Sequence, residues 1–175
     1  DQREEYDKGF VCYTRAEKLG YLTDGLGMCY EFGIGVEAQP TKAFAYYQDA
    51  AARGNQEAIY RLARSYYFGI GTEVDKKAAY NHFIEVAQQG NTYACYFVGL
   101  QLLNGDGIAM DMSDGVDWIR KAADADNAEA QFKLANCYLM GDGVEENEEK
   151  ALEWVERVAE NGHEEAIRLT KKTRK

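Results

Sequence analysis

A pair of glycines separated by a single residue recurs along the chain at a constant interval, and this repeat limits the fold more than any other feature. The pairs stand 36 residues apart, and no insertion is needed anywhere between residues 26 and 166. A constant period of this length is typical of stacked structural repeats. The repeated positions are Gly33/Gly35, Gly69/Gly71, Gly105/Gly107 and Gly141/Gly143, the small residues Ala58, Ala94, Ala130 and Ala166, and the bulky residues Leu26, Leu62, Val98 and Leu134.

Two segments of each repeat have the spacing of an amphipathic helix. In the first, which we name helix A, small and bulky residues recur at i, i+4, i+5 and i+8, as in residues 58–66. In the second, helix B, a small residue is followed three positions later by an aromatic one. Pairs such as Gly54-Asn55 predict a tight turn from B to A, because Gly suits a helix end and Asn caps the next helix. The Gly-x-Gly pairs predict a longer loop from A to B. The expected starts of helix B are Pro40, Asp75 and Ser113.

The spacing of small and aromatic residues requires a stack of such units. One helix pair alone cannot bury both kinds of residue, whereas neighbouring pairs can cover each other. The sequence therefore predicts an all-α fold, a right-handed α/α superhelix (solenoid) of about five antiparallel helix pairs with a 36-residue repeat. We expect one domain over residues 1–175, with end caps at 1–19, a helix of type B, and at 163–175. The expected repeat units are 20–54, 55–90, 91–126 and 127–162.

Two stretches of the repeat match a known family pattern. Residues 26–36 read Leu-Gly-Met-Cys-Tyr-Glu-Phe-Gly-Ile-Gly-Val, and residues 150–154 and 118–123 read Lys-Ala-Leu-Glu-Trp and Trp-Ile-Arg-Lys-Ala-Ala. Over residues 20–170 the chain resembles the Sel-one-like repeat (SLR) family, which is related to the tetratricopeptide repeat. Asp126 departs from the family pattern by replacing the turn glycine. The resemblance implies an adaptor or scaffold module rather than an enzyme.

The charge and composition exclude several classes of partner. With 30 acidic and 20 basic residues the net charge is -10, so phosphate backbones are repelled and no nucleic-acid partner is expected. No apolar run approaches the roughly 20 residues that cross a bilayer, so no membrane insertion is expected. Four cysteines are too few for a disulfide scaffold, which favours a reducing compartment such as the cytoplasm. A secreted or periplasmic location stays open if a signal peptide was removed.

The residue types that bind phosphate or metal ions or act in catalysis in other proteins have structural roles in this repeat. The glycine pairs lack the strand and the Gly-Lys-Ser/Thr sequence of a phosphate loop, and the Gly-Asp-Gly turns lack the ligand spacing of a calcium loop. His82 falls in an aromatic slot of helix B, and His163 falls in the N-cap slot of helix A. We therefore expect no catalytic residue, no cofactor and no metal site.

The cysteines leave one alternative function open. Cys29 and Cys137 share a repeat slot but lie three repeats apart, which is too far for a disulfide. Cys12 and Cys29 would face each other across the first helix pair, yet cysteine-rich members of the family carry a pair in each repeat and this chain does not. We expect four buried free thiols that behave as small apolar groups. The alternative is a metal- or redox-linked cysteine-containing repeat protein.

The face of helix A that does not carry the repeated packing residues is the candidate partner site. By analogy with tetratricopeptide arrays it lines the concave side of the superhelix, and exposed aromatic residues with polar anchors commonly bind proteins. We expect a non-enzymatic interaction module that binds a peptide or helix of a partner protein there, with Arg64 as a carboxylate anchor. Phe32, Phe68 and Met140 are open to packing against the next repeat instead, and exposed solenoid ends allow a homodimer. The candidate residues are Tyr21, Met28, Tyr60, Arg64, Tyr67, Tyr93, Tyr96, Leu100, Phe132 and Asn136.

Overall fold

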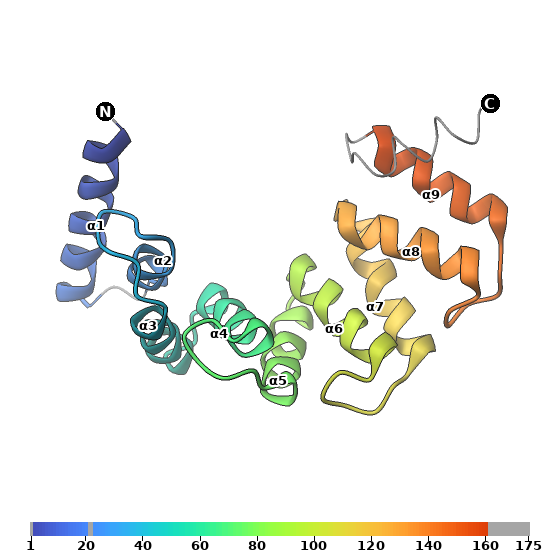
Figure 1. Ribbon diagram of the computed structural model, residues 1–175, viewed down its shortest axis with the longest axis horizontal. Helices are drawn as coiled ribbons and strands as arrows, with labels where there is room; N and C mark the ends of the chain where they lie inside the picture. Colours follow the sequence, from blue (N-terminus) through green and yellow to red (C-terminus); the bar gives the residue numbers. More distant parts are fainter. Residues whose placement is uncertain (1, 21–22, 161–175) are drawn as a thin grey trace. The chain divides into compact units, whose positions relative to one another are not determined.

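The computed structural model describes residues 2–20 and 23–160, and in these ranges the chain forms helices and no strand (Figure 1). A first helix is followed by four pairs of helices, each pair with the A and B segments that the sequence predicts. Tyr21, His163 and the cap expected at 163–175 lie outside the described residues. The helices are α1 (Gln2–Lys18), α2 (Gly25–Phe32), α3 (Pro40–Ala52), α4 (Gln56–Phe68), α5 (Lys76–Ala87), α6 (Thr92–Asn104), α7 (Met112–Asp124), α8 (Ala128–Met140) and α9 (Glu148–Glu160).

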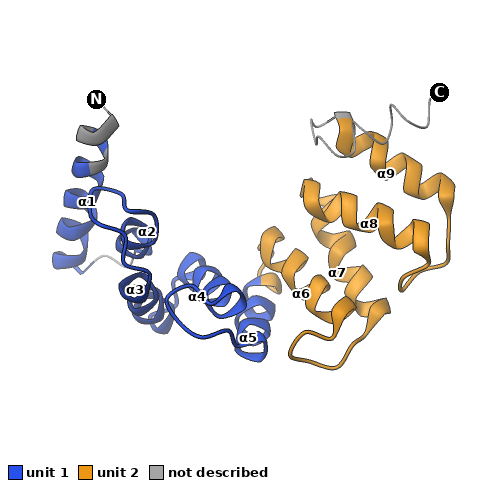
Figure 2. Cartoon of the chain, viewed as in Figure 1, with its two compact units in different colours: residues 1–86 blue, residues 87–175 orange. Residues whose placement is uncertain are grey.

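The chain divides into two compact units, each of which is described by itself (Figure 2). Unit 1 covers residues 1–86 and contains α1 to α5, and unit 2 covers residues 87–175 and contains α6 to α9. In unit 1, α2 packs against α3 and α3 packs against α4. In unit 2, α6 packs against α7, α7 against α8 and α8 against α9. The single domain expected over residues 1–175 stays a prediction.

The ends of the helices follow from the residues that recur at each period. Asn55, Asn91 and Asn127 cap α4, α6 and α8, and each side chain accepts a hydrogen bond from the backbone N–H three residues on. The loops from A to B begin with a left-handed glycine, as at Gly69 with φ 74°. Asp126 adopts φ 60°, which fits its position in the slot of a turn glycine, because Asp tolerates this backbone region better than most residues.

The start of α7 corrects one prediction. The helix begins at Met112, and Asp111 is its N-cap, with a side-chain oxygen that accepts the Asp114 N–H at 3.0 Å. The expected start at Ser113 is therefore wrong. The 36-residue period indicates the correct N-cap, because Asp111 lies one period after Asp75 and one period before Asn147. The side chains of Asp75 and Asn147 each cap the helix that follows them in the same way.

The core alternates small and large side chains across each helix pair. Ala58, Ala94 and Ala130 are fully buried at the start of helix A. In helix B the fully buried residues include Tyr47, whose ring lies directly over Gly27 of α2. A side chain at Gly27 would overlap this ring, so the close approach of α2 and α3 depends on glycine. The predicted pairing of small residues with aromatic or branched ones is thus how the helices of one repeat pack.

Candidate functional site

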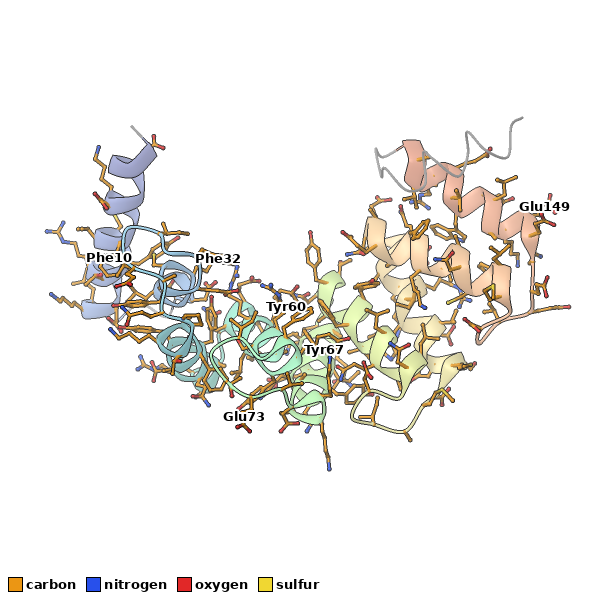
Figure 3. All side chains as sticks on the ribbon, in the orientation of Figure 1. Phe10, Phe32, Tyr60, Tyr67, Glu73 and Glu149 are labelled. Atoms are coloured by element: carbon orange, nitrogen blue, oxygen red, sulfur yellow. The ribbon has the colours of Figure 1, made fainter. Side chains whose placement is uncertain are left out.

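In unit 1 the candidate residues lie on α2 and α4. Tyr60 and Tyr67 extend from α4 (Figure 3), and both are half-buried. Their rings contact Phe83 of α5, with centroid distances of 5.9 and 6.1 Å, so they belong partly to the packing between α4 and α5. Lys76 at the start of α5 places its ammonium 3.2 Å from the centre of the Tyr67 ring. Met28 on α2 is also half-buried.

Arg64 lies near a carboxylate of its own chain. Its Nη1 is 3.9 Å from Oε1 of Glu31 on α2, and 27% of the Arg64 side chain is exposed. The other oxygen of Glu31 accepts a hydrogen bond of 2.6 Å from the hydroxyl of Tyr47. Burial and this hydrogen bond raise the pKa of Tyr47 well above its usual range. Arg64 therefore has an internal carboxylate beside it while part of its guanidinium surface remains open to solvent.

A second ion pair stabilises the contact between α2 and α4. Nε of Arg61 lies 2.8 Å from Oδ2 of Asp24, and Nη2 of Arg61 lies 2.9 Å from Oε1 of Glu57. Only 16% of the Arg61 and Asp24 side chains is exposed. Burial alone would lower the pKa of Arg61, yet the hydrogen bond to Asp24 and the neighbouring charges raise it overall. Because these groups satisfy one another, we assign Arg61 a structural role.

In unit 2 the candidate residues lie on α6 and α8. Tyr93 is 60% exposed, which makes it the most accessible of the described candidates. Tyr96, whose ring meets that of Phe97, and Leu100, Phe132 and Asn136 are half-buried. These side chains supplement a helix A core that is already filled by Ala94, Val98, Leu102 and their equivalents on α8.

The structure adds exposed apolar residues that the sequence left open. Phe32, Phe68 and Met140 end helix A and are 58%, 52% and 69% exposed, so more than half of each side chain is accessible. A groove of about 460 Å³ between α8 and α9 was missed by the sequence analysis, because it depends on which side of α9 stays uncovered. It is lined by Ala135, Asn136, Leu139, Glu148, Ala151, Leu152 and Val155.

The histidine that the structure describes, His82, packs against an aromatic ring. His82 stacks on Tyr66 with a centroid distance of 5.9 Å and an interplanar angle of 8°, as expected for an aromatic slot. Among the described residues, no group of three or more His, Cys, Asp or Glu side chains is arranged to hold a metal ion. In the same part of the chain, no helix is long and apolar enough to cross a membrane.

The cysteines are free thiols, and their exposure corrects the expectation of four buried ones. Cys29, Cys95 and Cys137 are buried, whereas Cys12 on α1 is exposed. The prediction was wrong for Cys12 because α1 has no helix packed over that side among the described residues. Burial raises the pKa of Cys29, Cys95 and Cys137, so these thiols stay protonated and unreactive at neutral pH.

Thiol labelling of the native protein is expected to give one fast reaction and three slow ones. Cys12 should react at once with a chromogenic disulfide at neutral pH, because its side chain is exposed. Cys29, Cys95 and Cys137 should react only after denaturant unfolds the chain. A Cys12→Ser variant should lose the fast phase and keep the three slow ones. Fast labelling of any buried thiol would favour the redox-linked alternative.

The fold is an α-helical repeat of the solenoid class, and the comparisons with known proteins identify the family. The Sel1 repeat pattern matches residues 25–55, 56–91, 92–127 and 128–163. The chain therefore belongs to the Sel1 repeat family, and the predicted SLR resemblance and all-α solenoid class are confirmed. Repeats of this family generally serve as protein-interaction modules and are generally non-enzymatic. A search of curated proteins found no match.

Several solved structures are similar to the chain. A protective antigen of uropathogenic Escherichia coli with an SLR fold is 30% identical, with a TM-score of 0.84, over 94% of this chain and 38% of the antigen. A Sel1 repeat protein of Oxalobacter formigenes is 26% identical, with a TM-score of 0.84, over 93% of this chain and 67% of that protein. Cysteine rich protein B of Helicobacter pylori shares the fold at 20% identity, with a TM-score of 0.59, over 75% and 95% of the two chains.

Proposed function

We propose that this chain is a scaffold module whose helix A faces bind a peptide or helix of a partner protein. The proposal rests on one observation: helix A retains surface aromatic residues after its core positions are filled. Phe32, Phe68 and Tyr93 are all more than half exposed, and large exposed aromatic side chains on a folded surface commonly mark binding sites. Arg64 adds a cation beside the aromatic residues of α4, and its partly open guanidinium suits a carboxylate of the partner.

The remaining candidates lie on helix A of the same two units. Tyr60 and Tyr67 are half-buried on α4, and Tyr96, Leu100, Phe132 and Asn136 are half-buried on α6 and α8. A half-buried aromatic ring is already held by its neighbours, so it loses little conformational entropy when a partner covers its remaining surface. We therefore propose one binding face in each unit, described by itself. In unit 1, Tyr60 and Tyr67 form the floor and Phe32 and Phe68 the accessible contacts. In unit 2, the floor is formed by Tyr96, Leu100, Phe132 and Asn136, and Tyr93 is the accessible contact.

Capture of partner proteins tests this function. The variant with both Tyr60→Ala and Tyr96→Ala should reduce capture of its partner from a lysate of the source organism by at least about tenfold, as hot-spot aromatic residues do. The control carries Val74→Ala and Met110→Ala, because these exposed apolar residues, one in each unit, lie in the loops from A to B. Circular dichroism should show unchanged helix content in both variants. Equal capture by wild-type protein and both variants would contradict the proposed face.

A further inference from the structure

Unit 1 has a groove of about 270 Å³ that crosses α3, α4 and α5. Ile59, Leu62 and Tyr66 line it from α4. Helical spacing places these three residues on a different side of α4 from Tyr60 and Tyr67. The groove is therefore separate from the binding face proposed for unit 1.

The groove has an apolar floor and a polar wall. Ile59 and Leu62, which are only 3% and 5% exposed, form part of the floor. On the side of α5, His82 stacks on the ring of Tyr66, and Glu85 stands one helical turn after His82 with an exposed side chain. The described residues that line this groove include no lysine and no arginine. An aliphatic surface thus meets an aromatic ring and a carboxylate in one groove.

In unit 2, the positions equivalent to Glu85 hold cations. Lys121 and Arg157 stand one and two periods after Glu85. The ammonium of Lys121 lies 3.7 Å from the centre of the Trp118 ring, and the guanidinium carbon of Arg157 lies 5.2 Å from the centre of the Trp154 ring. In both repeats the ring belongs to the aromatic position three residues earlier on helix B. A cation beside this aromatic position is therefore a recurring arrangement of the repeat.

The repeat that precedes the groove has a cation at the same place. Asp49 stands one period before Glu85, and its carboxylate pairs with Arg53 at 2.7 Å. Asp49, Arg53 and the aromatic residue Tyr46 line the equivalent pocket, which has a volume of only about 20 Å³ and holds no more than one water molecule. The groove across α3, α4 and α5 thus keeps the aromatic ring and the carboxylate, while its described lining supplies no lysine or arginine.

We propose that this groove receives an arginine side chain of a partner protein. The aliphatic stem of the arginine covers Ile59 and Leu62, while its guanidinium lies beside His82 and donates hydrogen bonds to Glu85. Arginine suits this groove better than lysine, because its planar guanidinium stacks on a ring and donates to a carboxylate at the same time. The net charge of -10 also favours the approach of a basic segment. The scaffold then has a contact surface in addition to its helix A faces.

Titration of the full chain with short peptides, followed by NMR, tests this contact. The methyl groups of Ile59 and Leu62 are the reporters, because they lie in the floor of the groove. The capped tripeptide Ala-Arg-Ala should shift both signals with a dissociation constant on the order of 1 mM. Its citrulline analogue has the same shape without the charge and should bind at least about threefold more weakly. The leucine analogue represents a purely apolar occupant and should bind more weakly than the arginine peptide.

A charge change at Glu85 gives the second part of the test. Glu85→Lys introduces the residue type found at Lys121, so the helix is retained, and it should weaken the arginine peptide at least about tenfold because two cations then meet. Glu73→Lys is the matched control, since Glu73, labelled in Figure 3, is an exposed residue of the loop between α4 and α5 that does not line the groove. Circular dichroism should show unchanged helix content in both variants.

Three results would overturn the proposal. These are equal binding of the arginine and leucine peptides, equal binding of the arginine peptide by the wild-type and Glu85→Lys chains, and no methyl shift up to about 10 mM peptide. The outcome is independent of the test of the helix A faces, because Tyr60 and Tyr96 do not line this groove.

Discussion

Replacing Gly143 with alanine is expected to destabilise unit 2 far more than replacing Gly90. Both glycines have a left-handed backbone, with φ 71° at Gly143 and φ 93° at Gly90. An alanine at either position must therefore adopt a backbone conformation that costs about 1–2 kcal/mol. At Gly143 the new Cβ would also overlap the backbone carbonyl of Met112 at the start of α7. At Gly90 it would meet no atom within 4 Å. We expect a total loss on the order of 4 kcal/mol for Gly143→Ala, because a backbone group cannot move aside without shifting its helix.

Urea unfolding followed by tryptophan fluorescence measures this difference. Trp118 and Trp154 are the only tryptophans in the sequence, and both lie in unit 2, so the signal reports the affected part of the chain. Gly90→Ala is the matched control, and the fluorescence midpoint of Gly143→Ala should fall well below it. The matching comparison in unit 1 is Gly71→Ala, which would overlap the carbonyl of Pro40, with Gly54→Ala, and it is followed by circular dichroism because unit 1 contains no tryptophan. Equal losses at Gly143 and Gly90 would show that the loop does not contact the preceding helix B.

The features that the sequence predicts correctly are those governed by local rules. An Asn at the end of a turn and a Gly after a helix act within a few residues, so Asn55 and Gly69 define helix ends without any knowledge of the rest of the chain. The same local signals then recur in each repeat, so every helix end is indicated more than once in the sequence. The family pattern and the helix pairs are for this reason predictable over most of the chain.

The features that sequence reasoning missed depend on which neighbours are present at a given place. Cys12 is exposed and Val11 is 60% exposed because α1 has few neighbours, although their pattern is that of a buried helix B. The sequence pattern places Tyr60 and Tyr67 outside the buried set of helix A, yet both contact Phe83, because α4 also packs on the following helix. A periodic pattern gives the position of a residue within its repeat. The exposure of that residue depends on whether a neighbouring repeat packs over the position.

Replacing Tyr47 is expected to be the most costly single change in the core of unit 1. Its side chain is fully buried, and its hydroxyl donates to Glu31 at 2.6 Å. Tyr47→Ala should lose about 3–5 kcal/mol of unfolding free energy, because it leaves a cavity between α2 and α3. Tyr47→Phe keeps the packing and should lose about 1.5–3 kcal/mol, the contribution of a hydrogen bond to a charged group. Urea unfolding followed by circular dichroism measures both values.

The small residue opposite Tyr47 allows the packing to be tested in both directions. Gly27→Ala should destabilise the wild-type chain by about 1–3 kcal/mol, because the added methyl overlaps the Tyr47 ring. In a Tyr47→Ala background the same change should instead be neutral or stabilising. The ring is then absent, and the helix propensity of alanine exceeds that of glycine by about 1 kcal/mol. The two effects would then be strongly non-additive, as expected for side chains in direct contact. Additive losses in the double variant would mean that Gly27 and Tyr47 do not pack together, and the pairing of small with large residues would then not be what joins helix A to helix B.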